Sequence, residues 1–116
     1  MTLYVTNAFS INMLPAGCST VAVFSPIRKT TAAELIERAK AAGDFMSAVG
    51  HKDTSAVFTT ELGTEIKENR INVTLGPADV LIVGQYTGPR LPEGATTLPE
   101  GATITWWLVT ARSYQQ

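Results

Sequence analysis

The chain has 116 residues, of which 45% are hydrophobic and 16% are charged, and its formal net charge at pH 7 is -1. This length and composition predict a single domain, residues 1–116, large enough to bury its own hydrophobic core. The nearly balanced charge argues against a protein that coats long nucleic acid, because such proteins make many Lys and Arg contacts to phosphates. A small anionic ligand bound by a few local arginines is compatible with this composition.

Neither a disulfide framework nor a targeting segment is expected. The only cysteine, Cys18, has no second thiol to pair with, and a Cys/His zinc site is not expected for the same reason. Residues 1–7 lack the basic and apolar regions of a signal peptide, and no apolar run approaches the ~20 residues that span a membrane. We therefore expect a cytoplasmic protein that does not contact membranes.

The beginning of the chain predicts two strands joined by a shaped loop. Leu3–Thr6 has the alternation of a short buried strand, and the polar and small residues that follow indicate a loop. Thr20–Phe24 is rich in β-branched and aromatic side chains, which favours a second strand. Pro26 is expected to close this strand.

A first helix is predicted next. The sequence Thr31-Ala32-Ala33-Glu34 matches a capping box, in which the Thr and Glu side chains each satisfy a free backbone N–H at the start of a helix. Gly43 provides the stop signal. Phe45 and Met46 are then expected to be core residues that anchor the following loop.

That loop, Ser47–Thr54, delivers the only histidine to the start of a second predicted helix, which runs through Leu62 and ends at Gly63. A helix N-terminus offers free N–H groups and the positive end of the helix dipole, and both suit a phosphate. The ordinary pKa of histidine lies nearest neutrality of all side chains, so His51 beside a phosphate is a candidate proton donor. A solvated surface histidine is the simpler alternative.

The second half of the chain predicts three more strands, at residues 70–75, 80–86 and 103–110, with a turn at residues 76–79. The continuous apolar run at residues 80–83 indicates the middle strand of the sheet. The hexapeptide LPEGAT occurs twice, at residues 91–96 and 98–103, and Glu93 therefore has a counterpart in Glu100. Together these elements predict an α/β fold, a single domain with a mixed central sheet flanked by helices.

Motifs for familiar chemistry are absent from the sequence. There is one His and one Cys, no dense carboxylate motif, no phosphate-binding Walker motif and no dinucleotide fingerprint. The polar candidates are His51, Arg70, Arg90 and Glu93, with Asn7, Ser10, Asn12 and Gln85. Structural alternatives remain open for them: Arg70 could pair with Glu68, Arg90 could pair with Glu93, and Asn7 could satisfy a strand end.

Four segments of the chain resemble the viral ring nuclease family: Asn7–Leu14, Ser47–His51, Asn69–Ile71 and Arg90–Gly94. This family comprises small anti-CRISPR proteins of archaeal viruses and bacteriophages, with cellular relatives associated with type III CRISPR systems. The resemblance extends over nearly the whole chain. The first two segments together are its most specific part.

The resemblance implies an enzyme that cleaves cyclic tetra-adenylate, the second messenger of type III CRISPR complexes, to linear di-adenylate bearing a 2′,3′-cyclic phosphate. It implies no metal and no cofactor. It further implies a symmetric homodimer that encloses the ring at the subunit interface, in the host cytoplasm if the protein is viral.

The resemblance also implies roles for individual residues. It makes His51 the general acid, with Arg90 and Glu93 as assisting catalytic residues and Glu100 as the alternative to Glu93. It places ligand contacts at Asn7, Ser10, Asn12, Gly50, Lys52, Asp53, Thr54, Arg70 and Gln85.

Two further functions stay open at the level of sequence. The first is a binding protein that sequesters a cyclic oligonucleotide without cutting it. The second is a structural protein of a virus or mobile element that has the same fold and no nucleotide ligand. Retention of His51 favours the enzyme over the sequestering protein.

Overall fold

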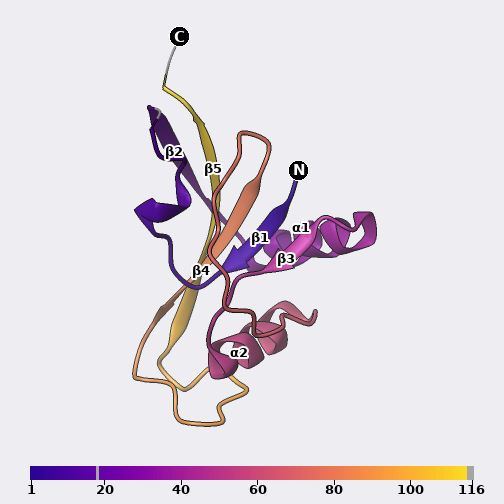
Figure 1. Cartoon of the computed structure of the whole chain (residues 1–116). Coiled ribbons are helices and arrows are strands. Elements are labelled where there is room, and N and C mark those ends of the chain that lie inside the picture. Colours follow the sequence, from indigo (N-terminus) through magenta and orange to yellow (C-terminus); the bar gives the residue numbers. More distant parts are fainter. Residues whose placement is uncertain (18, 115–116) are drawn as a thin grey trace.

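A computed structural model describes residues 1–17 and 19–114 of the chain as one domain, so Cys18 lies outside the described residues. In chain order, the elements are β1 (Leu3–Thr6), the 3-10 helix η1 (Ile11–Met13), β2 (Thr20–Ile27), α1 (Lys29–Ala42), β3 (Phe45–Ser47), α2 (Lys52–Leu62), β4 (Val80–Thr87) and β5 (Thr103–Ser113). The strands form one five-stranded sheet in the order β2-β5-β4-β1-β3 (Figure 1). This arrangement confirms the predicted α/β fold with a mixed sheet, and it confirms β4 as the middle strand.

The direction of the strands decides where loops meet. β1 runs parallel to both of its neighbours, β3 and β4, while β5 runs antiparallel to β4 and to β2. The carboxyl ends of β1, β3 and β4 therefore lie at the same edge of the sheet. α2 begins shortly after β3, and the long loop of residues 88–102 begins directly after β4. In open α/β sheets this carboxyl edge is where ligands bind.

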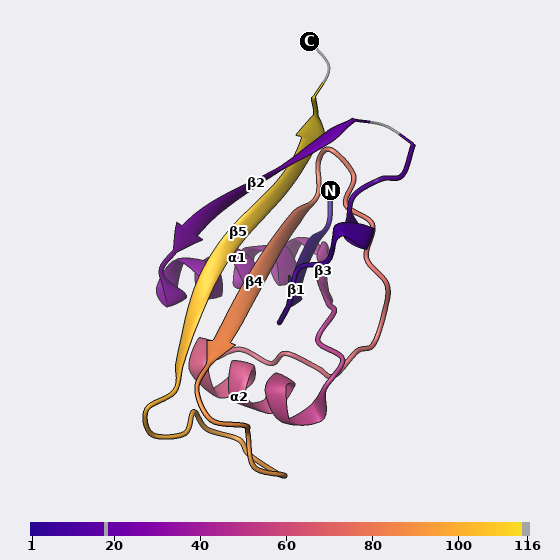
Figure 2. The same cartoon turned by 90° about the vertical axis from the view of Figure 1, so that its left-hand side faces the viewer.

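Both helices pack on one face of the sheet (Figure 2). Their buried side chains, which include Ile36 of α1 and Phe58 of α2, meet Val5, Ile82 and Trp106 from the strands. The rings of Phe58 and Trp106 lie 4.9 Å apart between centroids. This apolar contact fixes α2, and with it the residue that precedes α2, against the sheet.

The opposite face of the sheet is covered by irregular chain rather than by a helix. The segment between β1 and β2 and the segment between α2 and β4 pack there, and they bring Val73 and Leu75 into a second apolar cluster with Leu81 and Val109. The backbone N–H of Leu75 donates to the carbonyl of Met13 at 2.7 Å, which joins the two segments. This face is consequently open wherever these two segments do not reach.

Two predicted element boundaries are wrong. β2 continues through Pro26 to Ile27, because β2 is an edge strand and a proline without an N–H costs little there. α1 begins at Lys29 with Arg28 as its N-cap, so Thr31 lies inside the first turn and the capping box is not used. The N–H of Ala32 donates to the carbonyl of Arg28 at 3.0 Å, which shows that the helix already includes these residues.

Two other predictions along the chain are also corrected. Residues 70–75 form no strand, although Val73 and Leu75 are buried as their alternation suggested. Phe45 and Met46 belong to the short strand β3, in which Phe45 is half-buried and Met46 is 44% exposed. The helix ends predicted at Gly43 and Gly63 are confirmed, with left-handed φ values of 77° and 69°.

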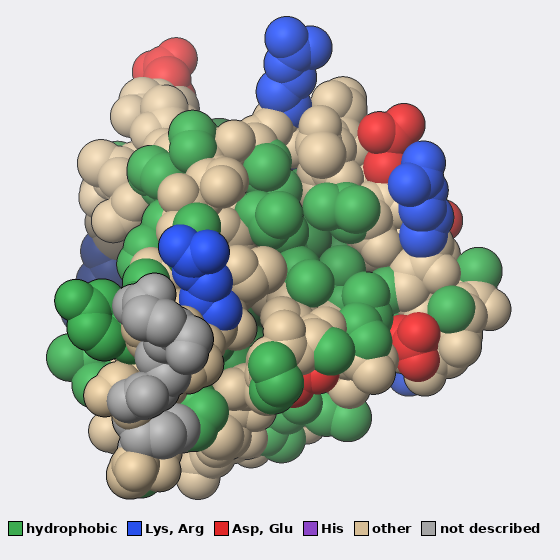
Figure 3. Space-filling view, turned by 90° about the horizontal axis from the view of Figure 1, so that it is seen from above, with side chains coloured by type: hydrophobic (Ala, Val, Ile, Leu, Met, Phe, Trp, Pro, Cys, Tyr) green, Lys and Arg blue, Asp and Glu red, His purple; other side chains and the backbone are tan. Residues whose placement is uncertain are grey.

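The end of the molecule seen from above in Figure 3 shows hydrophobic side chains in the middle of the view, charged side chains around them, and no histidine. The chain termini lie toward this end, whereas α2 lies toward the other (Figure 1). No helix of the described residues is long and apolar enough to span a membrane.

Candidate functional site

His51 is the N-cap residue of α2, as predicted. Its backbone is extended, with φ -125° and ψ 131°, and its exposed side chain makes no capping hydrogen bond. Its carbonyl accepts the N–H of Ser55 at 3.0 Å, which is the first bond of the helix. The first N–H groups of α2 thus donate no hydrogen bond to the imidazole. These N–H groups and the imidazole can both face an anion at the helix N-terminus.

The loop before His51 is held on both sides. The N–H of Ala48 donates to the carbonyl of Val5 in β1 at 2.8 Å, and the hydroxyl of Thr6 donates to the carbonyl of Ala48 at 3.1 Å. From the other side, the side-chain amide of Asn69 donates to the carbonyl of Ser47 at 2.7 Å. The histidine therefore starts from a backbone position fixed by the sheet and by the segment that follows α2.

Arg70 crosses this loop at Gly50. A Cβ atom on Gly50 would lie 3.4 Å from Nε of Arg70 and 3.5 Å from its Cβ and Cγ. These are ordinary van der Waals distances, so the exposed Arg70 side chain lies directly beside the backbone that precedes His51. An ion pair of Arg70 with Glu68, which the sequence left open, does not form among residues 1–17 and 19–114.

Arg90 and Glu93 come to the first turn of α2. Together with Asp53, Leu91 and Pro92 they line a groove of about 530 Å³. The carboxylate of Asp53 accepts the backbone N–H of Gly94 at 3.2 Å, which ties the loop to the helix two residues after His51. Glu100, the alternative glutamate, does not line this groove.

Arg90 and Glu93 are both exposed, and they do not pair with each other: in the described part of the chain the single ion pair joins Lys29 and Glu61 at 3.5 Å. The structural alternative for Arg90 is therefore wrong. Both side chains are free to contact a ligand in the groove.

The two copies of the hexapeptide fold in the same way. In each copy the N–H of the alanine donates to the carbonyl of the proline at 3.1 Å, from Ala95 to Pro92 and from Ala102 to Pro99. The glycines between them, Gly94 and Gly101, have φ values of 81° and 82°, as the third position of a type II turn requires. The repeat therefore makes two equivalent turns, and only the first is tied to α2 by Asp53.

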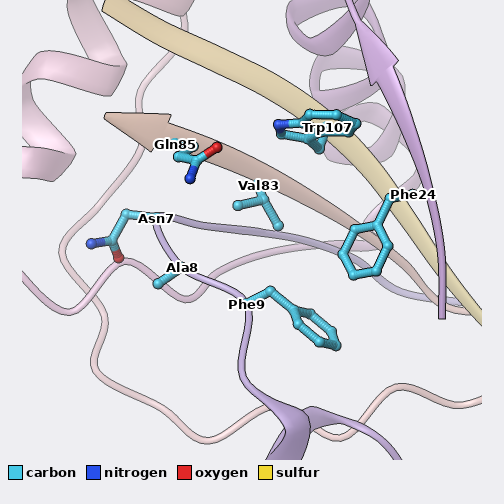
Figure 4. Close-up of a pocket in the computed structure, with 7 residues that line it drawn as sticks. All are labelled: Asn7, Ala8, Phe9, Phe24, Val83, Gln85 and Trp107. Atoms are coloured by element: carbon cyan, nitrogen blue, oxygen red, sulfur yellow. The ribbon is translucent and has the colours of Figure 1, made fainter. Parts of the chain in front are cut away.

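Asn7 and Gln85 lie in a second pocket of about 450 Å³. Thr6 pairs with Val83, so Asn7 follows β1 beside the end of β4. Figure 4 shows the two amide side chains at one end of the pocket and aromatic rings toward the other. The complete lining is Asn7, Ala8, Phe9, Phe24, Val83, Gln85 and Trp107.

Phe9 and Trp107 pack against the second apolar cluster and also line this pocket, a combination that no sequence motif indicated. The rings of Phe9 and Phe24 meet edge to face, with centroids 5.2 Å apart, and Phe24 is 47% exposed. Strand alternation indicates only the face of the sheet on which a side chain lies, and Phe24, Val83 and Trp107 all face away from the helices. The register between β2, β5 and β4 was needed to bring them together.

Six predicted ligand residues line neither pocket, and neither does His51; the six are Ser10, Asn12, Gly50, Lys52, Thr54 and Arg70. Ser10 is the N-cap of η1, and its hydroxyl accepts the N–H of Asn12 at 3.3 Å. Lys52 and Thr54 occupy the first turn of α2, where Lys52 is exposed and Thr54 is half-buried. Among the described residues no group of three His, Cys, Asp or Glu side chains is placed to hold a metal ion.

Comparison with known proteins gives a family and a structural relative. A family model described as STIV B116-like matches residues 3–104. The solved structure of B116 from Sulfolobus turreted icosahedral virus superposes with a TM-score of 0.80 at 25% sequence identity, over 95% of this chain and 99% of that chain. No curated protein matches the sequence.

Proposed function

This chain belongs to the STIV B116-like family, and from the site at the start of α2 we propose that it is a metal-independent ring nuclease for cyclic tetra-adenylate. The observation that carries the proposal is that the loop of Arg90 and Glu93 is tied to the first turn of α2, the helix that His51 caps. The sequence resemblance implied His51, Arg90 and Glu93 as the catalytic set.

The proposed reaction is an intramolecular transesterification. A ribose 2′-oxygen of the ligand forms a bond to the adjacent phosphorus as its proton passes to solvent, and the bond from phosphorus to the 5′-oxygen breaks. His51 donates a proton to the leaving 5′-oxygen, and the products carry a 2′,3′-cyclic phosphate and a 5′-hydroxyl. Arg90 and the N–H groups at the start of α2 stabilise the negative charge on the phosphorane.

Glu93 has the least direct role in this scheme. Its carboxylate lines the same groove as Arg90, from which it can orient the imidazolium or the arginine.

The pocket between Asn7 and Gln85 supports a ligand with purine bases. Aromatic walls suit a flat base, and amide groups can donate to and accept from its polar edge. This pocket opens at the carboxyl end of β1 and β4, the same edge of the sheet from which α2 begins. A ring that carries both bases and phosphates would engage the two pockets together.

We further propose that the active form is a homodimer with the ring between its subunits. Each subunit has one histidine, and a two-fold axis would present one His51 to each of two opposite linkages of a four-fold ring. Two linear di-adenylates result. Two copies of Arg90, Arg70 and the α2 N-terminus would face one tetra-anion, which reconciles its binding with a subunit charge of -1.

The test is incubation of the purified protein with cyclic tetra-adenylate in excess EDTA, with products separated by chromatography. Wild type is expected to release di-adenylate with a 2′,3′-cyclic phosphate. His51→Ala should lower turnover by about 10²- to 10⁴-fold, the usual contribution of general acid catalysis, and retain binding. Arg90→Ala should also lose activity, whereas Arg38→Ala, an exposed arginine on α1, serves as the matched control.

Intact ring in the wild-type sample would overturn the nuclease. A titration of the same samples then decides between the two alternatives. Binding without cleavage would identify a protein that sequesters the messenger, and absence of binding would indicate a structural protein with no connection to it.

A further inference from the structure

The long loop between β4 and β5, residues 88–102, is attached to α2 at two places. The carboxylate of Asp53 accepts the N–H of Gly94 at 3.2 Å, and the hydroxyl of Thr60 donates to the carbonyl of Thr96 at 2.6 Å. Asp53 and Thr60 are seven residues apart, which is about two helical turns, so they lie on the same side of α2. One face of the helix therefore holds the C-terminal half of the first hexapeptide, at Gly94 and Thr96.

Few other bonds restrain this loop. The hydroxyl of Tyr86 donates to the carbonyl of Pro89, and each hexapeptide closes its own turn. Among the described residues, no other element gives the loop a hydrogen bond besides α2 and this residue of β4. In the described part of the chain, the only hydrogen bonds that join the loop to α2 are those of the Asp53 and Thr60 side chains.

The hydroxyl of Thr60 has two possible acceptors, one in α2 and one in the loop. Its Oγ1 lies 3.2 Å from the carbonyl of Ala56 within the helix and 2.6 Å from the carbonyl of Thr96. A hydroxyl has one proton to donate, and the shorter distance assigns it to Thr96. Thr103, the equivalent of Thr96 in the second hexapeptide, begins β5 instead. The two copies of the hexapeptide therefore make different contacts. The first is hydrogen-bonded to α2, and the second leads into β5.

We propose that Asp53 and Thr60 are positioning residues, which hold Arg90 and Glu93 at the N-terminal end of α2 beside His51. This inference rests on the proposed function for its catalytic consequence. It reassigns Asp53, which the resemblance implied as a ligand contact, to the loop that carries the catalytic residues. It adds Thr60, which no motif in the sequence indicated.

Thr60 provides the cleaner test because it lies nine residues after His51, about 13 Å along the helix, and lines neither pocket. Thr60→Val keeps the shape and removes the donor, and Thr60→Ser keeps the donor. Amide hydrogen exchange, measured without nucleotide, reports the loop directly. Cleavage of cyclic tetra-adenylate, separated into kcat and KM, reports the site.

We expect Thr60→Val to speed exchange of the Gly94 amide and to lower kcat, each by about two- to tenfold, the range set by one exposed hydrogen bond. KM should change less than kcat, since Thr60 lines neither pocket. Thr60→Ser should restore both quantities. Exchange within β5 should stay at its wild-type rate in both variants.

Three results would overturn the proposal: exchange and kcat at wild-type values in Thr60→Val, a serine variant as impaired as the valine variant, or a lower kcat with unchanged loop exchange. Failure of the wild type to cleave the ring would overturn the proposed function and the catalytic consequence together. The exchange data would still decide, separately, whether Asp53 and Thr60 hold the loop.

Discussion

Gly84→Ala tests how tightly α2 is fixed on the sheet. Gly84 is buried in β4 and lies in register with Trp106 of β5. A Cβ atom there would lie 2.6 Å from Cζ3 of Trp106 and 2.7 Å from Cζ of Phe58. Because Phe58 belongs to α2, the substitution pushes directly on the helix whose first residue follows His51.

The expected cost follows from these distances. Carbon atoms rest about 3.5 Å apart, so the new methyl group would be about 0.9 Å too close to the indole. Neither ring can yield easily, since Phe58 is 1% and Trp106 3% exposed. Overpacking of this kind costs about 1–3 kcal/mol, out of a total stability of about 6–17 kcal/mol for a chain of this length. We expect the melting temperature to fall by about 5–15 °C.

The measurement is urea unfolding of the single variants and of Gly84→Ala combined with Phe58→Leu. Leucine lacks the Cζ atom that the new methyl group meets, so the double variant should recover about 1 kcal/mol relative to the sum of the single effects. A Gly84→Ala midpoint within about 0.5 kcal/mol of wild type, or strict additivity in the double variant, would refute this account of the contact.

Two further predictions concern the loop of residues 88–102 and the sheet face that irregular chain covers. Glu93→Gln should lower turnover of cyclic tetra-adenylate about tenfold in a cleavage assay, while Glu100→Gln stays near wild type. The two residues occupy equivalent turns, and only Glu93 lines the groove with Arg90. Equal effects of the two substitutions would contradict that assignment. Leu75→Ala should lower the free energy of unfolding by about 2–5 kcal/mol in urea titration, since Leu75 is fully buried although it belongs to no strand. A loss below about 1 kcal/mol would show that the segment between α2 and β4 contributes little to stability.

The elements predicted best from the sequence were those with strong local signals. The apolar run of β4 indicated a strand buried on both faces, and Gly43 and Gly63 marked helix ends because a left-handed residue closes a helix. Local patterns misled where a tertiary contact replaced the local one. The alternation at residues 70–75 reflects burial against Met13 and the sheet without strand pairing.

The candidate site shows the same contrast between local signals and tertiary contacts. The sequence by itself determined that the single histidine would stand at the start of a helix, since the glycine before it and the periodicity after it act over a few residues. Only the tertiary structure decided which groups share a pocket with which. Glu93, and not Glu100, lines the groove with Arg90 in the turn that the Asp53–Gly94 bond ties to α2, and the register of β2, β5 and β4 assembles the aromatic pocket. Both arrangements depend on contacts between residues far apart in the chain. The two hexapeptides are identical, so their own sequences cannot indicate which of them contacts α2.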